Sequence, residues 1–99
     1  MISANLTNAA RKAIYKRDNY ACALCDSTRG LQIHHAIPRS EGGGNNHHNL
    51  ITLCWRCHAM AHGTRMPEYP CWMDQDEIRQ ACIEYLADLY APDWYPYRV

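Results

Sequence analysis

No apolar run in this 99-residue sequence is long enough to span a membrane or to form the hydrophobic part of a signal peptide. Polar and basic side chains interrupt residues 1–18, so we expect an intracellular, cytoplasmic protein with no membrane partner. Internal repeats and low-complexity tracts are also absent. A chain of this length forms one domain at most, and its hydrophobic core is small enough to benefit from a bound metal.

The sequence also lacks net charge, since ten lysines and arginines balance ten acidic residues. Zero net charge does not by itself favour a nucleic-acid partner, but the charges are unevenly distributed. Residues 1–65 hold eight basic and three acidic side chains, whereas residues 66–99 hold two basic and seven acidic ones. A polyanion would therefore meet the first part of the chain.

Cysteines are plentiful, and four of them form two Cys-x-x-Cys pairs, Cys22/Cys25 and Cys54/Cys57. In a reducing compartment such pairs are more often metal ligands than disulfides. Four thiolates in two turns suit a closed, tetrahedral zinc site, which stabilises a fold without taking part in chemistry. The alternative is a group of buried free cysteines.

A different grouping would join the second cysteine pair to His58 and His62, but it lacks the spacer of a Cys-Cys-His-His finger. The two remaining cysteines stay outside the predicted site. Cys82 falls on an apolar helix stripe, which predicts a buried thiol, and the sequence is silent about Cys71.

Periodicity predicts an α+β chain. Apolar residues at helical spacing predict a first helix that ends near Arg17, with Asn5 as its cap. Two short strands, residues 31–35 and 50–53, flank a loop with three consecutive glycines, and a short helix over about 56–63 follows. Asp74 and Glu77 form a capping box that begins a final helix, and the aromatic tail 94–97 is expected to pack against the domain.

Histidines cluster on two of these elements. His34 and His35 are adjacent in the first strand and should face opposite ways, while His58 and His62 lie one turn apart on one helix face. Clustered imidazoles suit a metal that keeps a coordination position open for chemistry. The loop pair at positions 47 and 48 is read as having no catalytic task.

Together, the tandem histidines, the glycine loop, Asn49, the second cysteine pair and the helix histidines resemble the HNH endonuclease motif over residues 20–62. The resemblance implies a small ββα-metal domain whose structural Zn²⁺ is held by two Cys-x-x-Cys knuckles, flanked by an N-terminal and a C-terminal helix. We expect residues 1–99 to form a single HNH nuclease domain, with its core at about 20–63 and a helical extension at about 67–99.

The resemblance also implies roles. His34, His58 and His62 become ligands of a catalytic divalent metal, His35 the general base, and Asn49 the residue that holds the loop and orients the base. The metal could be Mg²⁺, Mn²⁺, Ni²⁺, Co²⁺ or Zn²⁺, although three imidazoles favour the softer ions over Mg²⁺.

Candidates for DNA contact are basic side chains of the first helix and of the loop: Arg11, Lys12, Lys16, Arg17 and Arg39. The helical ones lie late in the helix, where cations also complement the macrodipole, and Arg39 could equally be a solvated loop arginine.

The resulting expectation is a metal-dependent endonuclease that hydrolyses DNA and leaves 5′-phosphate and 3′-hydroxyl ends. The likeness to small phage-encoded members suggests the host cytoplasm, with phage packaging proteins or a second copy as further partners. The alternative is a noncatalytic zinc module that binds DNA or protein. A zinc hydrolase with another substrate ranks last, because no His-Glu-x-x-His element is present.

Overall fold

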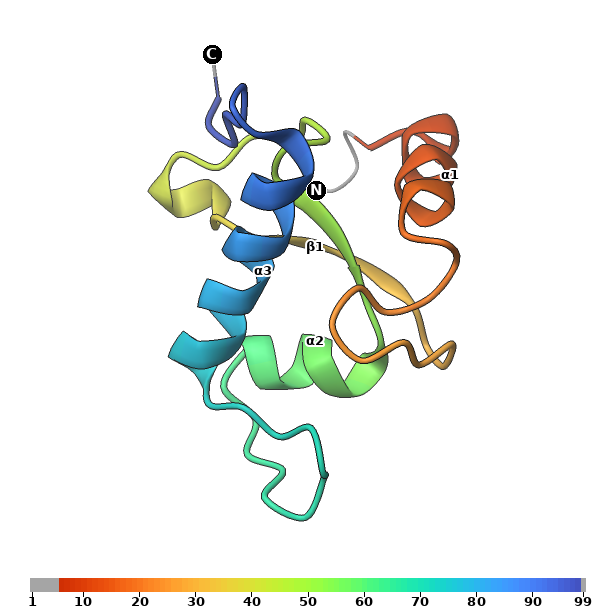
Figure 1. Ribbon diagram of the computed structural model, residues 1–99, viewed down its shortest axis with the longest axis vertical. Helices are drawn as coiled ribbons and strands as arrows, with labels where there is room; N and C mark the ends of the chain where they lie inside the picture. Colours follow the sequence, from red (N-terminus) through yellow and green to blue (C-terminus); the bar gives the residue numbers. More distant parts are fainter. Residues whose placement is uncertain (1–5, 99) are drawn as a thin grey trace.

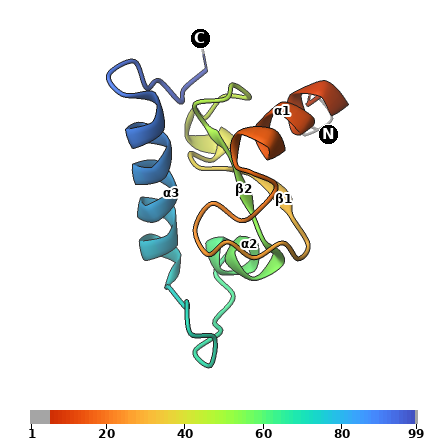
Figure 2. The same cartoon turned by 45° about the vertical axis from the view of Figure 1, so that its right-hand side comes forward.

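The computed structural model describes residues 6–98. In these residues two antiparallel strands and three α-helices form a small α+β fold, as predicted. The strands lie between α1 and α3, with α2 across one end of them (Figures 1 and 2). The elements in chain order are α1 (Asn8–Arg17), β1 (Gln32–His35), the 3-10 helix η2 (Arg39–Glu41), β2 (Leu50–Leu53), α2 (Trp55–Ala61) and α3 (Gln75–Tyr90).

The helix ends follow local capping rules. Thr7 caps α1 by accepting a hydrogen bond from the backbone N–H of Ala10 at 3.0 Å, so the prediction of Asn5 as the cap is wrong, and Asn5 itself lies outside the described residues. The capping box at the start of α3 is present, with Asp74 and Glu77 each bonding the other's backbone N–H. None of the helices within residues 6–98 is both long and apolar enough to cross a membrane.

The two strands pair in a register that sets the position of the histidines. His34 lies opposite Ile51 and His35 opposite Leu50. All four residues of β2 are buried, because α1 covers one face of the strand pair and α2 and α3 lie on the other side. β1 is only partly buried, so its histidines stay within reach of solvent.

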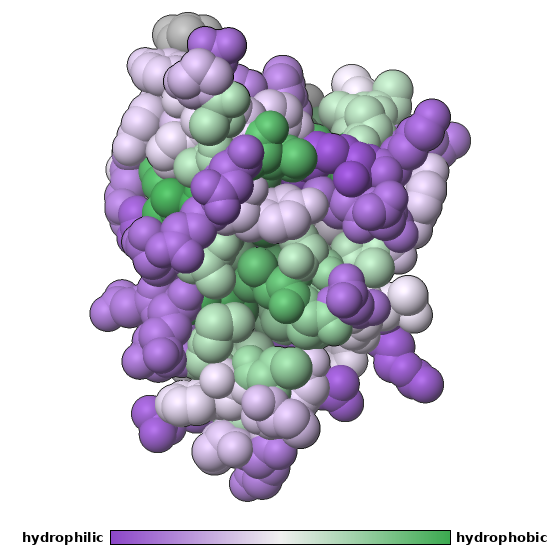
Figure 3. All heavy atoms as spheres, viewed as in Figure 1, coloured by the Kyte–Doolittle hydropathy of each residue, from purple (hydrophilic) through white to green (hydrophobic). Residues whose placement is uncertain are grey.

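The main core joins α3 to the rest of the domain. Ile78, Cys82 and Leu86 of α3 are fully buried against Met60 of α2 and against the cysteine pairs. Cys82 is therefore the buried thiol that the helix stripe predicts, and burial raises its pKa to about 12. Figure 3 shows apolar residues gathered in the middle of one face, with polar residues along both edges.

A polar brace ties α1 to β2 and α3. The Asp18 carboxylate has no exposed side-chain surface and accepts from Arg17, from the Tyr85 hydroxyl and from the Thr52 backbone N–H. The Arg17 guanidinium also donates to backbone carbonyls in the loop before β2 and in β2, and to the hydroxyl of Tyr90. The brace thereby attaches both flanking helices, α1 and α3, to strand β2.

The aromatic tail packs on the domain in part. The Trp94 indole N–H donates to the carbonyl of His48 at 2.8 Å, and Pro96 is buried. Tyr95 and Tyr97 remain exposed. Residues 42–44 hydrogen-bond to this tail, so the end of the chain lies against the loop that joins the two strands.

Candidate functional site

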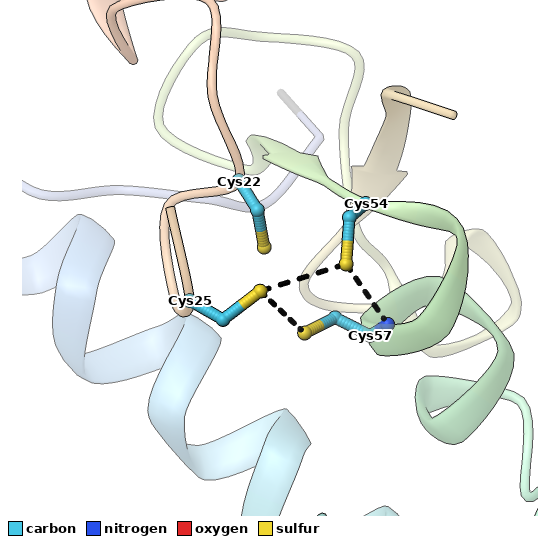
Figure 4. Close-up of side chains that lie close together, drawn as sticks. All are labelled: Cys22, Cys25, Cys54 and Cys57. Carbon is cyan, nitrogen blue, oxygen red and sulfur yellow. Dashed lines mark hydrogen bonds between the residues drawn. The ribbon is translucent and has the colours of Figure 1, made fainter. Parts of the chain in front are cut away.

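The four cysteines of the two pairs converge on one point. Cys22 and Cys25 come from the turn after α1, and Cys54 and Cys57 from the start of α2, with all four sulfurs directed inward (Figure 4). Their Sγ atoms lie within 4.8 Å of one another. The Cys25–Cys54 and Cys25–Cys57 sulfur distances are 3.6 and 3.8 Å, too long for a disulfide bond.

These distances fit a metal. Four sulfurs placed about 2.3 Å from one zinc ion lie roughly 3.8 Å apart in a regular tetrahedron. A hydrogen bond from Cys57 lowers the pKa of Cys22 to about 5, whereas that hydrogen bond and burial raise the pKa of Cys57. Because thiolates this close repel one another, a cation is needed to bring all four to the charged state. The four cysteines can therefore hold a structural metal.

A second cluster is made of imidazoles alone. His34 of β1 meets His58 of α2 and His62 at the end of α2, with ligand atoms within 4.8 Å of one another. The Nε2 atoms of His58 and His62 are 3.3 Å apart. Two imidazole nitrogens on one ion at about 2.0–2.1 Å would be separated by about that distance. Three such ligands leave coordination positions free, and His62 faces solvent.

Burial favours the neutral form of His34 and His58. It lowers the pKa of His34 to about 3, helped by the charges that His58, His62 and His35 would carry. Burial and the neighbouring His62 also lower the pKa of His58. Neutral imidazole is the form that binds metals, so the cluster is suited to a cation.

Beside the imidazoles is an open cavity of about 610 Å³. His34 and His35 both line it, although they are neighbours in a strand. Their partners differ: His34 packs against the helix histidines, while His35 bonds to the loop. Side chains that sequence reasoning missed complete the wall: Glu41 from η2 and Gln75, Asp76 and Arg79 from α3.

Asn49 holds the loop between the strands. It is fully buried, and its side chain bonds to the N–H of Ile37 at 2.7 Å and to the carbonyls of Ile37 and Gly44 at 3.0 and 2.9 Å. Gly43 is required there, since a Cβ atom would lie 1.9 Å from the Ile37 carbonyl oxygen. The side chain of Asn49 thus links the backbone at Ile37 to the backbone at Gly44.

The hydrogen bond to the predicted base comes from a different asparagine. His35 Nε2 lies 2.7 Å from the side-chain oxygen of Asn45, whereas the three side-chain bonds of Asn49 all go to backbone groups. Sequence reasoning missed Asn45 because it is one of several asparagines in a loop with no periodicity.

The basic candidates separate into two groups. All five N–H donors of Arg17 are used within the protein, so this side chain serves the brace and has no donor left for a phosphate. Arg39 lines the cavity, and its Nη1 atom is buried without a hydrogen-bond partner in the described chain. Lys12 and Lys16 are exposed on α1, and Arg11 is half-exposed.

Known proteins match the same region. A sequence profile described as "HNH endonuclease" matches residues 22–64. Anaredoxin of Nostoc sp. is 37% identical over 54 residues, 54% of this chain and 71% of that protein. The "Probable mobile endonuclease C" of Enterobacteria phage T4 is 36% identical over 61 residues, 62% of this chain but only 25% of that protein. No solved structure matches the chain with statistical significance.

Proposed function

We propose, from the premise that this chain belongs to the HNH endonuclease family, that it is a metal-dependent endonuclease that hydrolyses DNA phosphodiester bonds. The observation that carries the proposal is the meeting of three imidazoles, His34, His58 and His62, beside a fourth, His35, in one open cavity. A structural site alone would not need the open side or the additional histidine.

Each residue then has a task. His34, His58 and His62 hold the divalent cation, and His35 takes a proton from the attacking water. A cation bound there would neutralise charge on the phosphoryl oxygens and stabilise the leaving oxygen. Asn49 fixes the loop that forms one wall of the cavity. Three imidazole ligands favour Mn²⁺, Co²⁺, Ni²⁺ or Zn²⁺ over Mg²⁺.

The cysteine cluster has a separate, structural role. We assign a Zn²⁺ ion to Cys22, Cys25, Cys54 and Cys57, because the sulfur spacing matches a closed tetrahedral site. Cys54 also caps α2, the helix that carries His58. The zinc would therefore fix one end of the catalytic cluster.

Phosphate contact is assigned first to Arg39, whose buried Nη1 lacks a partner within residues 6–98 and whose side chain lines the cavity. Arg11, Lys12 and Lys16 form a more distant basic surface on α1. We infer that both flanking helices belong to one nuclease unit, since the brace and the core tie them to it. The described surface gives no argument for a packaging protein or a second copy, so the proposal names DNA alone.

The test is cleavage of supercoiled plasmid by protein stripped of weakly bound metal and then given Mg²⁺, Mn²⁺, Co²⁺, Ni²⁺ or Zn²⁺. We expect nicked or linear product that requires an added metal and is lost in His35→Ala. His47→Ala is the matched control, because this exposed loop histidine does not line the cavity. A folded, zinc-loaded protein that cuts nothing with any metal would instead support a noncatalytic zinc module.

A further inference from the structure

The side-chain oxygen of Asn45 faces the ring of His35, with 2.7 Å between Oδ1 and Nε2. The two residues come from different parts of the fold: His35 ends β1, and Asn45 lies in the loop that leads to β2. The contact is partly buried, which strengthens a hydrogen bond relative to one in open water.

This bond selects one form of the imidazole. An amide oxygen can only accept a hydrogen bond, so the proton of the neutral ring must lie on Nε2. The other nitrogen, Nδ1, then carries the free electron pair that can accept a proton from water. A free histidine populates both tautomers and can rotate its ring, and the Asn45 contact removes both kinds of freedom.

The loop on either side of Asn45 is fixed to the rest of the domain. The carbonyl of Gly44 accepts from the buried Asn49 side chain at 2.9 Å, and the N–H of Gly44 donates to the carbonyl of Pro96 at 2.9 Å. On the other side, the Asn46 side chain donates to the carbonyl of Tyr97 at 3.3 Å. The residues on both sides of Asn45 are therefore attached to Asn49 and to residues 96 and 97, which limits the movement of the loop.

We propose that Asn45 is the positioning residue of the general base: it holds His35 in the Nε2–H tautomer, with Nδ1 directed to the water that attacks DNA. The inference rests on the proposed nuclease function, and it moves the orienting role from Asn49 to Asn45. Asn49 acts at one remove, by holding the Gly44 carbonyl next to Asn45.

The experiment combines two readouts on zinc-loaded protein. The first is the tautomer of His35, measured by ¹⁵N NMR of the ring nitrogens about two pH units above the usual histidine pKa of roughly 6.5, with His35→Gln to assign the signals. The second is the single-turnover cleavage rate and the DNA affinity. The variants are Asn45→Ala, Asn45→Asp, which keeps an acceptor oxygen, and His47→Ala. The last is the matched control, since it removes an exposed side chain of the same loop that does not line the cavity.

We expect the Nε2–H tautomer of His35 in the wild type, in Asn45→Asp and in His47→Ala, and a tautomer mixture in Asn45→Ala. The cleavage rate of Asn45→Ala should fall about 10- to 100-fold, as for other residues that orient a reactive side chain, with little change in DNA affinity. Asn45→Asp should recover most of that loss.

Two results would overturn the proposal while leaving the nuclease function intact: a wild-type His35 protonated on Nδ1, or an active Asn45→Ala variant whose tautomer and rate match the wild type. A wild-type protein that cuts no DNA with any metal would fail the proposed function itself, and Asn45 would then have no base to position. The tautomer measurement separates the two failures because it does not depend on cleavage.

Discussion

The hydroxyl of Tyr85 in α3 donates to the carboxylate of Asp18 at 2.7 Å, although 67 residues separate them in the chain. Asp18 lies just after α1, and its second oxygen also accepts from the Thr52 backbone N–H of β2 at 3.0 Å. One buried carboxylate therefore joins both flanking helices to the central strands. The shape of the cavity beside the three histidines depends on this attachment, because α3 supplies part of its wall.

Removing parts of this brace should destabilise the fold in graded steps. Asp18→Asn leaves the donors of Arg17 imperfectly paired and should lower the free energy of unfolding by about 2–3 kcal/mol, and Tyr85→Phe, which removes one donor, by about 1–2 kcal/mol. Tyr20→Phe is the control, since Tyr20 is 59% exposed. Urea unfolding would measure all three. Equal stabilities for Tyr85→Phe and Tyr20→Phe would show that the Asp18 contact contributes nothing.

The lowered pKa of the Asp18 carboxylate predicts that the free energy of unfolding depends on pH. Burial alone would raise the pKa of Asp18, but hydrogen bonds from Arg17 and Tyr85 and the charge of Arg17 outweigh it and lower the pKa. A lowered folded-state pKa contributes stability above the unfolded value of about 3.9, and that stability is lost as pH falls through the folded pKa. The difference in unfolding free energy between wild type and Asp18→Asn should therefore be constant near neutral pH and shrink below about pH 4.

Acid also protonates metal ligands, so the pH dependence of the wild-type unfolding free energy contains more than the contribution of Asp18. Taking the difference from Asp18→Asn at each pH cancels that contribution, because both proteins carry the same cysteines and histidines. Denaturant titrations at several pH values from neutral to acidic would supply the curves. A difference that stays constant through the acid range would mean that Asp18 titrates alike in the folded and unfolded chains.

The cysteine cluster should be essential for folding. Cys57→Ser removes one of four converging sulfurs, and a structural zinc contributes about 10–16 kcal/mol, as much as the whole net stability of a typical domain. The variant should lose its tightly held zinc and its cooperative thermal transition. Cys71→Ser is the matched control, since Cys71 is exposed and outside the cluster. Metal analysis after dialysis, with thermal melts, tests both. A Cys57→Ser protein that melts like the control would show that the metal has no structural role.

Sequence reasoning succeeded where the signal was local. Residue spacing predicted that the four cysteines converge and that His58 and His62 lie together, because Cys-x-x-Cys turns and histidines four residues apart on a helix bring their side chains together through local geometry. Alternating and helical periods gave β1, β2 and α2 for the same reason. The capping box of α3 is likewise a local pattern, read directly from Asp74 and Glu77.

Sequence reasoning failed where long-range contacts decide which partner a side chain has. Arg17 lies at the end of α1, where either a macrodipole role or phosphate contact was reasonable, but its donors go to β2, to the loop before it and to Tyr90. Asn45 and Asn49 are alike in sequence, and only the folded loop shows which one reaches His35. A sequence pattern has no means of ranking polar residues within an irregular loop.

Arg39 should contribute to DNA binding through its unpartnered nitrogen, unlike Arg17. Arg39→Ala should weaken DNA binding and lower the slope of log affinity against log salt by about one, the effect of losing one phosphate contact. The fold of Arg39→Ala should be unchanged, since the Nη1 atom of Arg39 makes no hydrogen bond within the described chain.

Arg17→Ala should have the opposite effect. Because the five donors of Arg17 hold the brace together, the main loss should be in the free energy of unfolding. Lys12→Ala, at an exposed position on α1, calibrates the effect of one distant charge. Binding isotherms at several salt concentrations, with thermal melts of each variant, would distinguish the roles, and an Arg39→Ala protein with an unchanged salt slope would rule out its phosphate contact.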